Sequence, residues 1–300
     1  MGILRRVTAL YKPPRETRGV DEAIKNMLRK VAAFIAVLAA VAGGTYRGSV
    51  VSSFNGFVHQ GSADWAPLGV AYGAGYVWVI YYPGLVTKRV PASGSIISTV
   101  YLSTGAGSGE SLAWEAARAY LYACCRGSGA SYWNAASGEL AGSFPLPAGA
   151  ARLNGIDYNN RGSPPIWACQ WGYLPPEINS VIWNMTAGGS VVSSWNVNYW
   201  PVEPRCLAYD GDTAGGPFLF VGMYSAPSVI GVVNPANCSL VSTFRAPTYD
   251  NSLADLAWDG TYLWAVDNGP GASGWIYRFV AHEYPAVTPA SWGRIKAAFR

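Results

Sequence analysis

Polar side chains recur at one position of a repeat, where they could converge to do chemistry. Each of five repeats carries an aromatic residue, and four positions before it stand Leu68, Glu110, Asn154, Arg205 and Ala254. One position further on, Asp255 replaces a small residue. If the repeats surround an axis, Glu110, Asn154, Arg205 and Asp255 converge on the mouth of a central channel. There Glu110 and Arg205 could form an ion pair that plugs the channel.

Aromatic side chains on loops form a second candidate site. The loops that precede the first strand of each repeat, and those between its second and third strands, should gather on one face. Their rings present flat surfaces with hydrogen-bonding tips, which suit a sugar or a protein partner. Alternatively, proline-rich loops fold these rings back over the strands. The candidates are Trp65, Tyr82, Trp171, Tyr173, Tyr199 and Trp200.

A repeated hairpin must position both sets. The clearest copy, residues 255–267, has alternating apolar residues on both sides of an Asp259-Gly260 turn, a strong hairpin signal. A third and a fourth strand follow the hairpin in the first four copies. The aromatic residues that mark the repeats, Tyr72, Trp114, Tyr158, Tyr209 and Trp258, lie 42, 44, 51 and 49 residues apart. This period is typical of four-stranded propeller blades.

The fifth repeat lacks a fourth strand, and the other end of the repeat region supplies one. Residues 49–54 (SVVSSF) nearly duplicate residues 190–195 (SVVSSW) and resemble 239–244 (SLVSTF). The sequence therefore predicts an all-β, five-bladed propeller over 48–284, with residues 48–57 closing the ring as the outer strand of the last blade. Within it, Trp78, Trp167, Trp264 and their equivalents should pack between blades.

Composition limits the classes of function. Charged residues make up 13% of the 300 residues, the net charge is +4, and basic residues are concentrated in the first 30 positions. The remainder carries no basic stripe, which argues against nucleic acid as a partner. The five cysteines allow one disulfide among Cys124, Cys125 and Cys169, a less expected Cys206–Cys238 bridge, or buried thiols only.

The segments outside the repeats read as targeting and attachment sequences. Residues 27–42 combine a basic start, an apolar run and Ala40-Val41-Ala42, which is typical of a bacterial secretory signal peptide. We expect a secreted or cell-surface protein without a membrane span in its mature chain; an uncleaved anchor is the alternative. Residues 1–26 form a basic lead ahead of Met27, itself a possible start. The tail, 285–300, could form a short helix that docks on the rim or serves as an attachment tag.

The repeat also resembles a known superfamily. With second strands such as Leu263-Trp264-Ala265 and turns rich in Ser and Gly, the chain is similar to the secreted bacterial β-propellers with YVTN, NHL and WD-like repeats. This resemblance implies the fold, because propellers carry many unrelated activities.

Two short strings resemble those of propeller enzymes. Residues 109–114 (GESLAW) and 154–156 (NGI) look like the metal-binding strings of gluconolactonase and regucalcin-type propellers. That resemblance implies Glu110 and Asn154 as Ca²⁺ ligands of a lactonase-like hydrolase, although those enzymes have six blades and Arg205 departs from the pattern. Residues 154–158 (NGIDY) are loosely similar to a blade opening of five-bladed glutaminyl cyclases, whose acidic catalytic strings have no counterpart here.

These observations favour a binding module over an enzyme. We expect a glycan or protein ligand on the aromatic loop face and no cofactor. A Ca²⁺-dependent hydrolase and a structural unit of an extracellular assembly are the alternatives.

Overall fold

The computed structural model describes residues 47–60, 63–103, 109–125, 129–172, 179–198, 200, 203–211, 213, 216–248, 253–268 and 274–282. They form one compact unit, 47–282. The predicted lead, signal peptide and tail lie outside the described residues. No helix long and apolar enough to cross a membrane occurs in the part of the chain that the structure describes.

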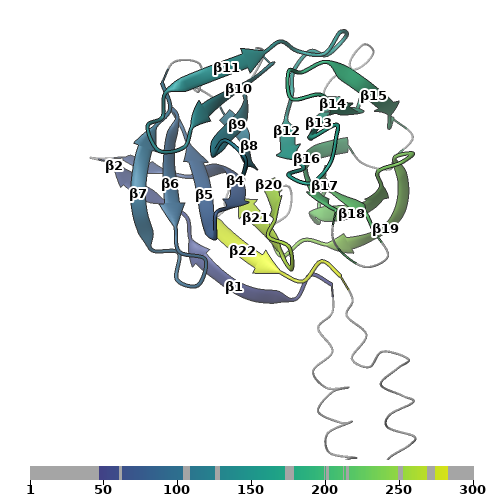
Figure 1. The fold of residues 1–300 in the computed structure, drawn as a ribbon. Coiled ribbons are helices and arrows are strands. Elements are labelled where there is room, and N and C mark those ends of the chain that lie inside the picture. The colour runs from purple at the N-terminus through teal and green to yellow at the C-terminus, as the bar shows by residue number, and fades with distance from the viewer. Residues whose placement is uncertain are drawn as a thin grey trace, which may run out of the picture. The chain divides into compact units, whose positions relative to one another are not determined.

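Five sheets of four antiparallel strands surround a common axis (Figure 1). The first blade contains β4 (Pro67–Gly73), β5 (Tyr76–Tyr81), β6 (Leu85–Arg89) and β7 (Ile96–Tyr101). The second contains β8 (Gly109–Glu115), β9 (Tyr120–Cys125), β10 (Gly129–Asn134) and β11 (Leu140–Phe144). The third contains β12 (Gly155–Tyr158), β13 (Ile166–Gln170), β14 (Val181–Met185) and β15 (Val191–Asn196).

The remaining two blades complete the ring. The fourth contains β16 (Glu203–Asp210), β17 (Phe218–Tyr224), β18 (Val229–Asn234) and β19 (Ser239–Arg245). The fifth contains β20 (Leu253–Trp258), β21 (Leu263–Asp267), β22 (Trp275–Phe279) and β1 (Val50–Asn55). A small hairpin of β2 (Val58–Gln60) and β3 (Ala63–Trp65), which the sequence analysis missed, connects β1 to β4. The predicted five-bladed propeller is confirmed.

The ring closes as predicted, by pairing β1 with β22. Val50 lies opposite Phe279 and Asn55 opposite Trp275. Beyond β1, the carbonyl of Gly56 accepts hydrogen bonds from the Tyr81 hydroxyl at 2.6 Å and from Arg89 Nη2 at 3.1 Å. Both donors belong to the first blade, and Arg89 is only 3% exposed. The segment that closes the ring is therefore fastened to both blades between which it lies.

Aromatic pairs join each blade to the next. An aromatic residue of the second strand packs against the marker residue of the following blade, at ring-centroid distances of 5.2 to 6.4 Å. The pairs are Trp78–Trp114, Tyr122–Tyr158, Trp167–Tyr209, Phe220–Trp258 and Trp264–Tyr72. The prediction that Trp78, Trp167 and Trp264 pack between blades is thus confirmed.

Asp255 ties three blades together at the axis. Its carboxylate accepts hydrogen bonds from the Val70 N–H at 2.8 Å, the Leu112 N–H at 2.9 Å and the Ser111 hydroxyl at 2.7 Å. Asp255 is fully buried, and this burial raises the pKa of its carboxyl well above the ordinary value although the hydrogen bonds act in the opposite direction. One carboxylate thereby satisfies donors from two neighbouring blades.

The inner strands approach one another most closely at this level. A Cβ atom on Gly69 would lie 2.9 Å from Ser111 Cα, and one on Gly155 would lie 2.7 Å from Cys206 Cα. Only glycine permits such contact between backbones. With Asp255, these residues form a closed layer across the axis.

Cys169 and Cys206 do not take part in the bridges considered from the sequence. Cys169 and Cys206 are buried and free, so neither Cys169 with Cys124 or Cys125 nor Cys206 with Cys238 is joined. The Sγ atom of Cys206 packs so closely on Gly222 that a Cβ there would lie 2.3 Å away. Backbone of the same blade thus occupies the space beside this sulfur.

We predict that Asp255→Ala lowers the free energy of unfolding by about 3–5 kcal/mol, because it leaves buried donors of two other blades without an acceptor. Urea unfolding followed by tryptophan fluorescence measures the change. Ser111→Ala is the control: it removes the links of Ser111 to Asp255 and Ile156 but leaves the Asp255 carboxylate in place, and it should cost less, about 1–3 kcal/mol. Equal losses in the two variants would contradict the role of Asp255.

Candidate functional site

A β-bulge recurs at the same place on four inner strands. The register shifts between Pro67 and Gly69, Gly109 and Ser111, Pro204 and Cys206, and Leu253 and Asp255. The bulged residues are therefore Leu68, Glu110, Arg205 and Ala254, and Asn154 stands at the equivalent place just before β12. Because a bulge re-aims the side chain that it carries, these positions can face along the axis instead of into a sheet.

All five positions line one pocket of about 120 Å³, together with Arg152, Trp171 and Asn268. We call it the bulge pocket. The structure thus brings Glu110, Asn154 and Arg205 together at one mouth of the axis. Asp255 is one residue beyond a bulge and lies in the closed layer, not among the pocket-lining residues.

Asn154 organises the polar side of the bulge pocket. Its Nδ2 donates to Glu110 Oε2 at 3.1 Å, and its Oδ1 accepts the Trp171 N–H at 2.9 Å. The Trp171 indole N–H donates to the Glu203 carboxylate. Burial raises the pKa of Glu203, and the positive charge of Arg152 opposes that shift. Donors and acceptors are therefore held in fixed positions around one indole.

Two arginines lie over the aromatic side of the same pocket. The guanidinium of Arg152 is 4.9 Å from the ring centre of Trp171, and that of Arg205 is 5.7 Å from Tyr224. The rings of Trp171 and Tyr224 are 4.5 Å apart. Such cation–π contacts hold the guanidinium groups beside the rings. Sequence reasoning did not identify Arg152, Glu203 or Asn268, although each occupies a repeated position. Arg152 and Glu203 stand six residues before their marker aromatics, and Asn268 follows Trp264 at the distance at which Trp171 follows Trp167.

The other predicted aromatic residues lie apart from the bulge pocket. Tyr82 is 61% exposed and does not line it. Trp65 ends β3 and packs, half-buried, against the core of the first and last blades. Trp200 is 7% exposed and packs in the core between the third and fourth blades. Tyr173 and Tyr199 lie outside the described residues.

A second, larger pocket of about 410 Å³ lies at the opposite ends of the inner strands. We call it the turn pocket, because all five turns that connect a first strand to a second strand contribute to it. Its walls include the five marker aromatics of the repeats, Tyr72, Trp114, Tyr158, Tyr209 and Trp258. The repeat assigned these residues to packing only. Small residues stand beside the marker aromatics in the sequence, and they were the signal that the turn pocket is open. These residues are Gly73, Ala74, Ala116, Gly211 and Gly260.

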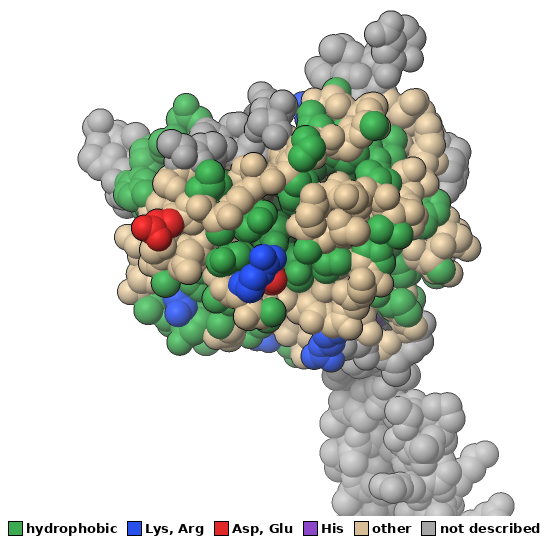
Figure 2. Space-filling model, turned by 45° about the horizontal axis from the view of Figure 1, so that its top comes forward, with side chains coloured by type: hydrophobic (Ala, Val, Ile, Leu, Met, Phe, Trp, Pro, Cys, Tyr) green, Lys and Arg blue, Asp and Glu red, His purple; other side chains and the backbone are tan. Residues whose placement is uncertain are grey.

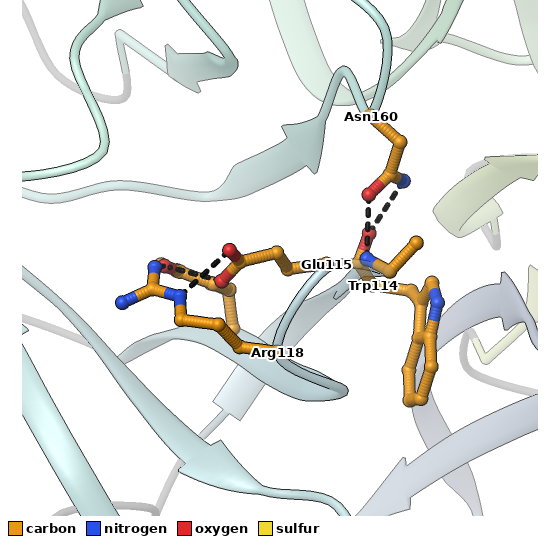
Figure 3. Close-up of polar contacts among 6 residues, drawn as sticks. Trp114, Glu115, Arg118 and Asn160 are labelled. Atoms are coloured by element: carbon orange, nitrogen blue, oxygen red, sulfur yellow. Dashed lines mark hydrogen bonds and ion pairs between the residues drawn. The ribbon is translucent and has the colours of Figure 1, made fainter.

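The third blade fastens the rim of the turn pocket to the second. Asn160 Nδ2 donates to the Trp114 carbonyl at 2.8 Å, and its Oδ1 accepts the Ala116 N–H at 2.6 Å (Figure 3). Beside this contact, Arg118 Nε donates to Glu115 at 2.7 Å. The turn that carries Ala116 is therefore held from two sides.

Asp157 joins the third blade to the fourth in the same wall. Its Oδ2 accepts the Tyr209 N–H at 2.6 Å. Burial raises the pKa of Asp157 to about 6, although hydrogen bonds from the backbone lower it. The folded protein therefore holds the proton of this carboxyl more tightly than an unfolded chain would.

The residues of the bulge pocket do not fit a Ca²⁺ ion. Glu110 is the single carboxylate among its lining residues, the Asn154 amide is engaged on both sides, and Arg152 and Arg205 bring positive charge. Within the described ranges, no group of three or more His, Cys, Asp or Glu residues could hold a metal ion. Ca²⁺ prefers six to eight oxygen ligands, which these residues do not supply.

The fold and its two axial pockets define the class: a five-bladed β-propeller that is closed at mid-axis and hollowed at both ends. No family model matches the chain, and no curated protein matches its sequence. The YVTN, NHL and WD-like resemblance therefore rests on the repeat alone. Among solved structures, the chain is similar to a glutaminyl cyclase from Myxococcus xanthus, with a TM-score of 0.54 and 13% identity over 78% of this chain and 97% of that one. At this identity the likeness shows the fold.

We predict that the stability of the protein depends on pH through Asp157. Because its folded pKa of about 6 exceeds the ordinary 3.8, the folded state binds this proton more tightly than the unfolded state. The free energy of unfolding should therefore fall as the pH rises from about 4 through 6, by about 1–3 kcal/mol for this group.

Urea unfolding at several pH values between 4 and 7.5 tests this prediction. Asp157→Asn keeps an acceptor for the Tyr209 N–H and should flatten the dependence by the contribution of Asp157. Asp255 titrates in both proteins and therefore cancels in the comparison. Identical pH profiles for the two proteins would show that Asp157 has an ordinary pKa.

Proposed function

We propose that this chain is a carbohydrate-binding propeller whose site is the bulge pocket. The observation that carries the proposal is the alternation of fixed donors and acceptors around Trp171. Arg152 and Arg205 can donate and Glu110 can accept, while Asn154 and Glu203 hold Glu110 and Trp171 in position. A sugar hydroxyl both donates and accepts, and aromatic side chains commonly border the sites that bind such amphipathic rings.

The size and surroundings of the bulge pocket favour a sugar over a protein partner. Its volume of about 120 Å³ suits one terminal ring or part of one. A protein interface of ordinary size buries about 800 Å² on each partner and has an apolar centre. Charged side chains are few and scattered on the face seen in Figure 2. The bulge pocket, by contrast, has Glu110, Arg152 and Arg205 among its eight lining residues.

The structural-unit alternative has one supporting observation. The outer strands carry large exposed apolar side chains, among them Val51, Ile97, Val192 and Val241 at 45% to 59% exposure. Edge strands with such side chains can pair with other chains. The hydrolase alternative has less support, because the bulge pocket lacks a set of Ca²⁺ ligands. Secretion stays a prediction from residues 27–42.

We predict that Trp171→Ala weakens the binding of a sugar ligand at least tenfold, because it removes a wall of the pocket and the indole N–H that Glu203 accepts. A glycan array identifies the ligand, and calorimetry measures its affinity for the purified chain. Glu110→Gln should weaken the same ligand, since it exchanges an acceptor oxygen for a donor. Tyr82→Ala is the control, because Tyr82 is exposed and lines neither pocket.

The same measurements decide between the alternatives. If Trp171→Ala and Glu110→Gln bind a sugar with the same affinity as the natural chain, the proposed site is wrong. A protein ligand lost in Trp171→Ala would replace the glycan as the occupant. Saturable Ca²⁺ binding that Glu110→Gln abolishes would favour the hydrolase.

A further inference from the structure

We propose that the turn pocket is a second ligand site, which binds a neutral, polyhydroxylated ring such as a disaccharide. The propeller would then hold one sugar ligand at each end of its axis. The turn pocket shares no lining residue with the bulge pocket, and the closed layer of Gly69, Ser111, Gly155 and Asp255 lies between the two levels. The proposal goes beyond the function proposed above and rests on a separate set of residues.

The dimensions of the turn pocket are those of a ligand site. Its volume of about 410 Å³ is more than three times that of the bulge pocket and falls within the range of small-molecule sites. All five blades contribute to its walls, and the Asn160 and Asp157 hydrogen bonds join the third blade to both neighbours. A wall fastened in this way is formed before a ligand arrives, which lowers the cost of binding.

The aromatic walls disfavour a flat ligand. Tyr72, Trp114 and Tyr209 are stacked on tryptophans of the preceding blades, at interplanar angles of 11° to 14°. The Trp114 ring also lies against Gly73, where a Cβ would come within 2.3 Å of three ring atoms. Faces used in this way are not available to sandwich a planar base or indole. The rings offer edges and tyrosine hydroxyl groups, which suit a non-planar ring bearing hydroxyls.

The polar groups of the turn pocket favour a neutral ligand. Asp259 accepts hydrogen bonds from the Trp264 indole at 2.9 Å and from Arg278 at 3.0 Å, so its charge is compensated. Asn160 is engaged with the second blade. Asp157 and Arg161 supply one charge of each sign. A phosphate would need more cationic groups than this wall provides, whereas hydroxyl groups can use both donors and acceptors.

The test is a titration of the purified full chain with cellobiose, maltose, lactose and N,N′-diacetylchitobiose. Saturation-transfer NMR detects binding, and calorimetry gives the affinity. Ala116→Trp places a bulky side chain in the turn pocket from an exposed turn and should weaken the bound disaccharide at least tenfold. The matched control, Ala136→Trp, makes the same substitution on an exposed turn outside both pockets and should change the affinity by less than twofold.

A milder variant tests the hydroxyl groups themselves. Tyr72→Phe combined with Tyr209→Phe keeps both stacked rings and should weaken binding at least threefold. Trp171→Ala, which alters the bulge pocket, should leave this affinity within twofold of the natural value, so the two sites are measured separately. Failure of the bulge pocket to bind any sugar would leave these expectations unchanged.

Two results would overturn the proposal. One is that Ala116→Trp weakens the binding of none of the four disaccharides. This includes the case in which all binding is lost in Trp171→Ala and kept in Ala116→Trp. The other is that a planar probe, adenosine or indole, binds to the natural chain and loses this binding in Ala116→Trp, while the disaccharides do not bind. Either would show that the turn pocket does not recognise hydroxylated rings.

Discussion

The buried carboxylate of Asp255 is the interaction on which the ring depends. It accepts hydrogen bonds from Val70 and Leu112 in the first and second blades, and Ser111 extends the contact to the Ile156 N–H of the third blade at 3.1 Å. Polar groups at the axis of a closed ring cannot reach water, so each needs a partner inside the protein. Asp255 meets that need at the level where Gly69 and Gly155 lie against neighbouring strands, between two pockets that share no lining residue.

The bulges convert this scaffold into a site. A regular strand would send successive side chains to opposite faces of its sheet. The extra residue at Leu68, Glu110, Arg205 and Ala254 escapes that alternation. Leu68 and Ala254 pack against the core, whereas Glu110 and Arg205 bring charged groups to the pocket.

The sequence alone predicted the repeat, the ring closure and the shared position of Glu110, Asn154 and Arg205, because all three follow from periodicity. It did not predict Arg152 or Glu203, because the repeat gives their shared position, six residues before a marker aromatic, but not that their side chains lie beside Trp171. Asp255 looked like another site residue because periodicity cannot tell a bulge from the paired residue after it. Tyr72 and Tyr209 stack between blades and also border the turn pocket. The composition indicates only the stacking.

The way in which β1 completes the fifth blade has a mechanical consequence. The chain enters at Val50 and leaves at Phe279, which are paired residues of one antiparallel ladder, and the adjoining backbone is bonded from Gly48 to Val280 at 2.8 Å. A force that draws the two ends apart therefore loads this ladder at its open end and separates its hydrogen bonds one after another. An attachment through one end alone would leave the ladder unloaded. Whether such a domain resists tension thus depends on how many of its ends are held.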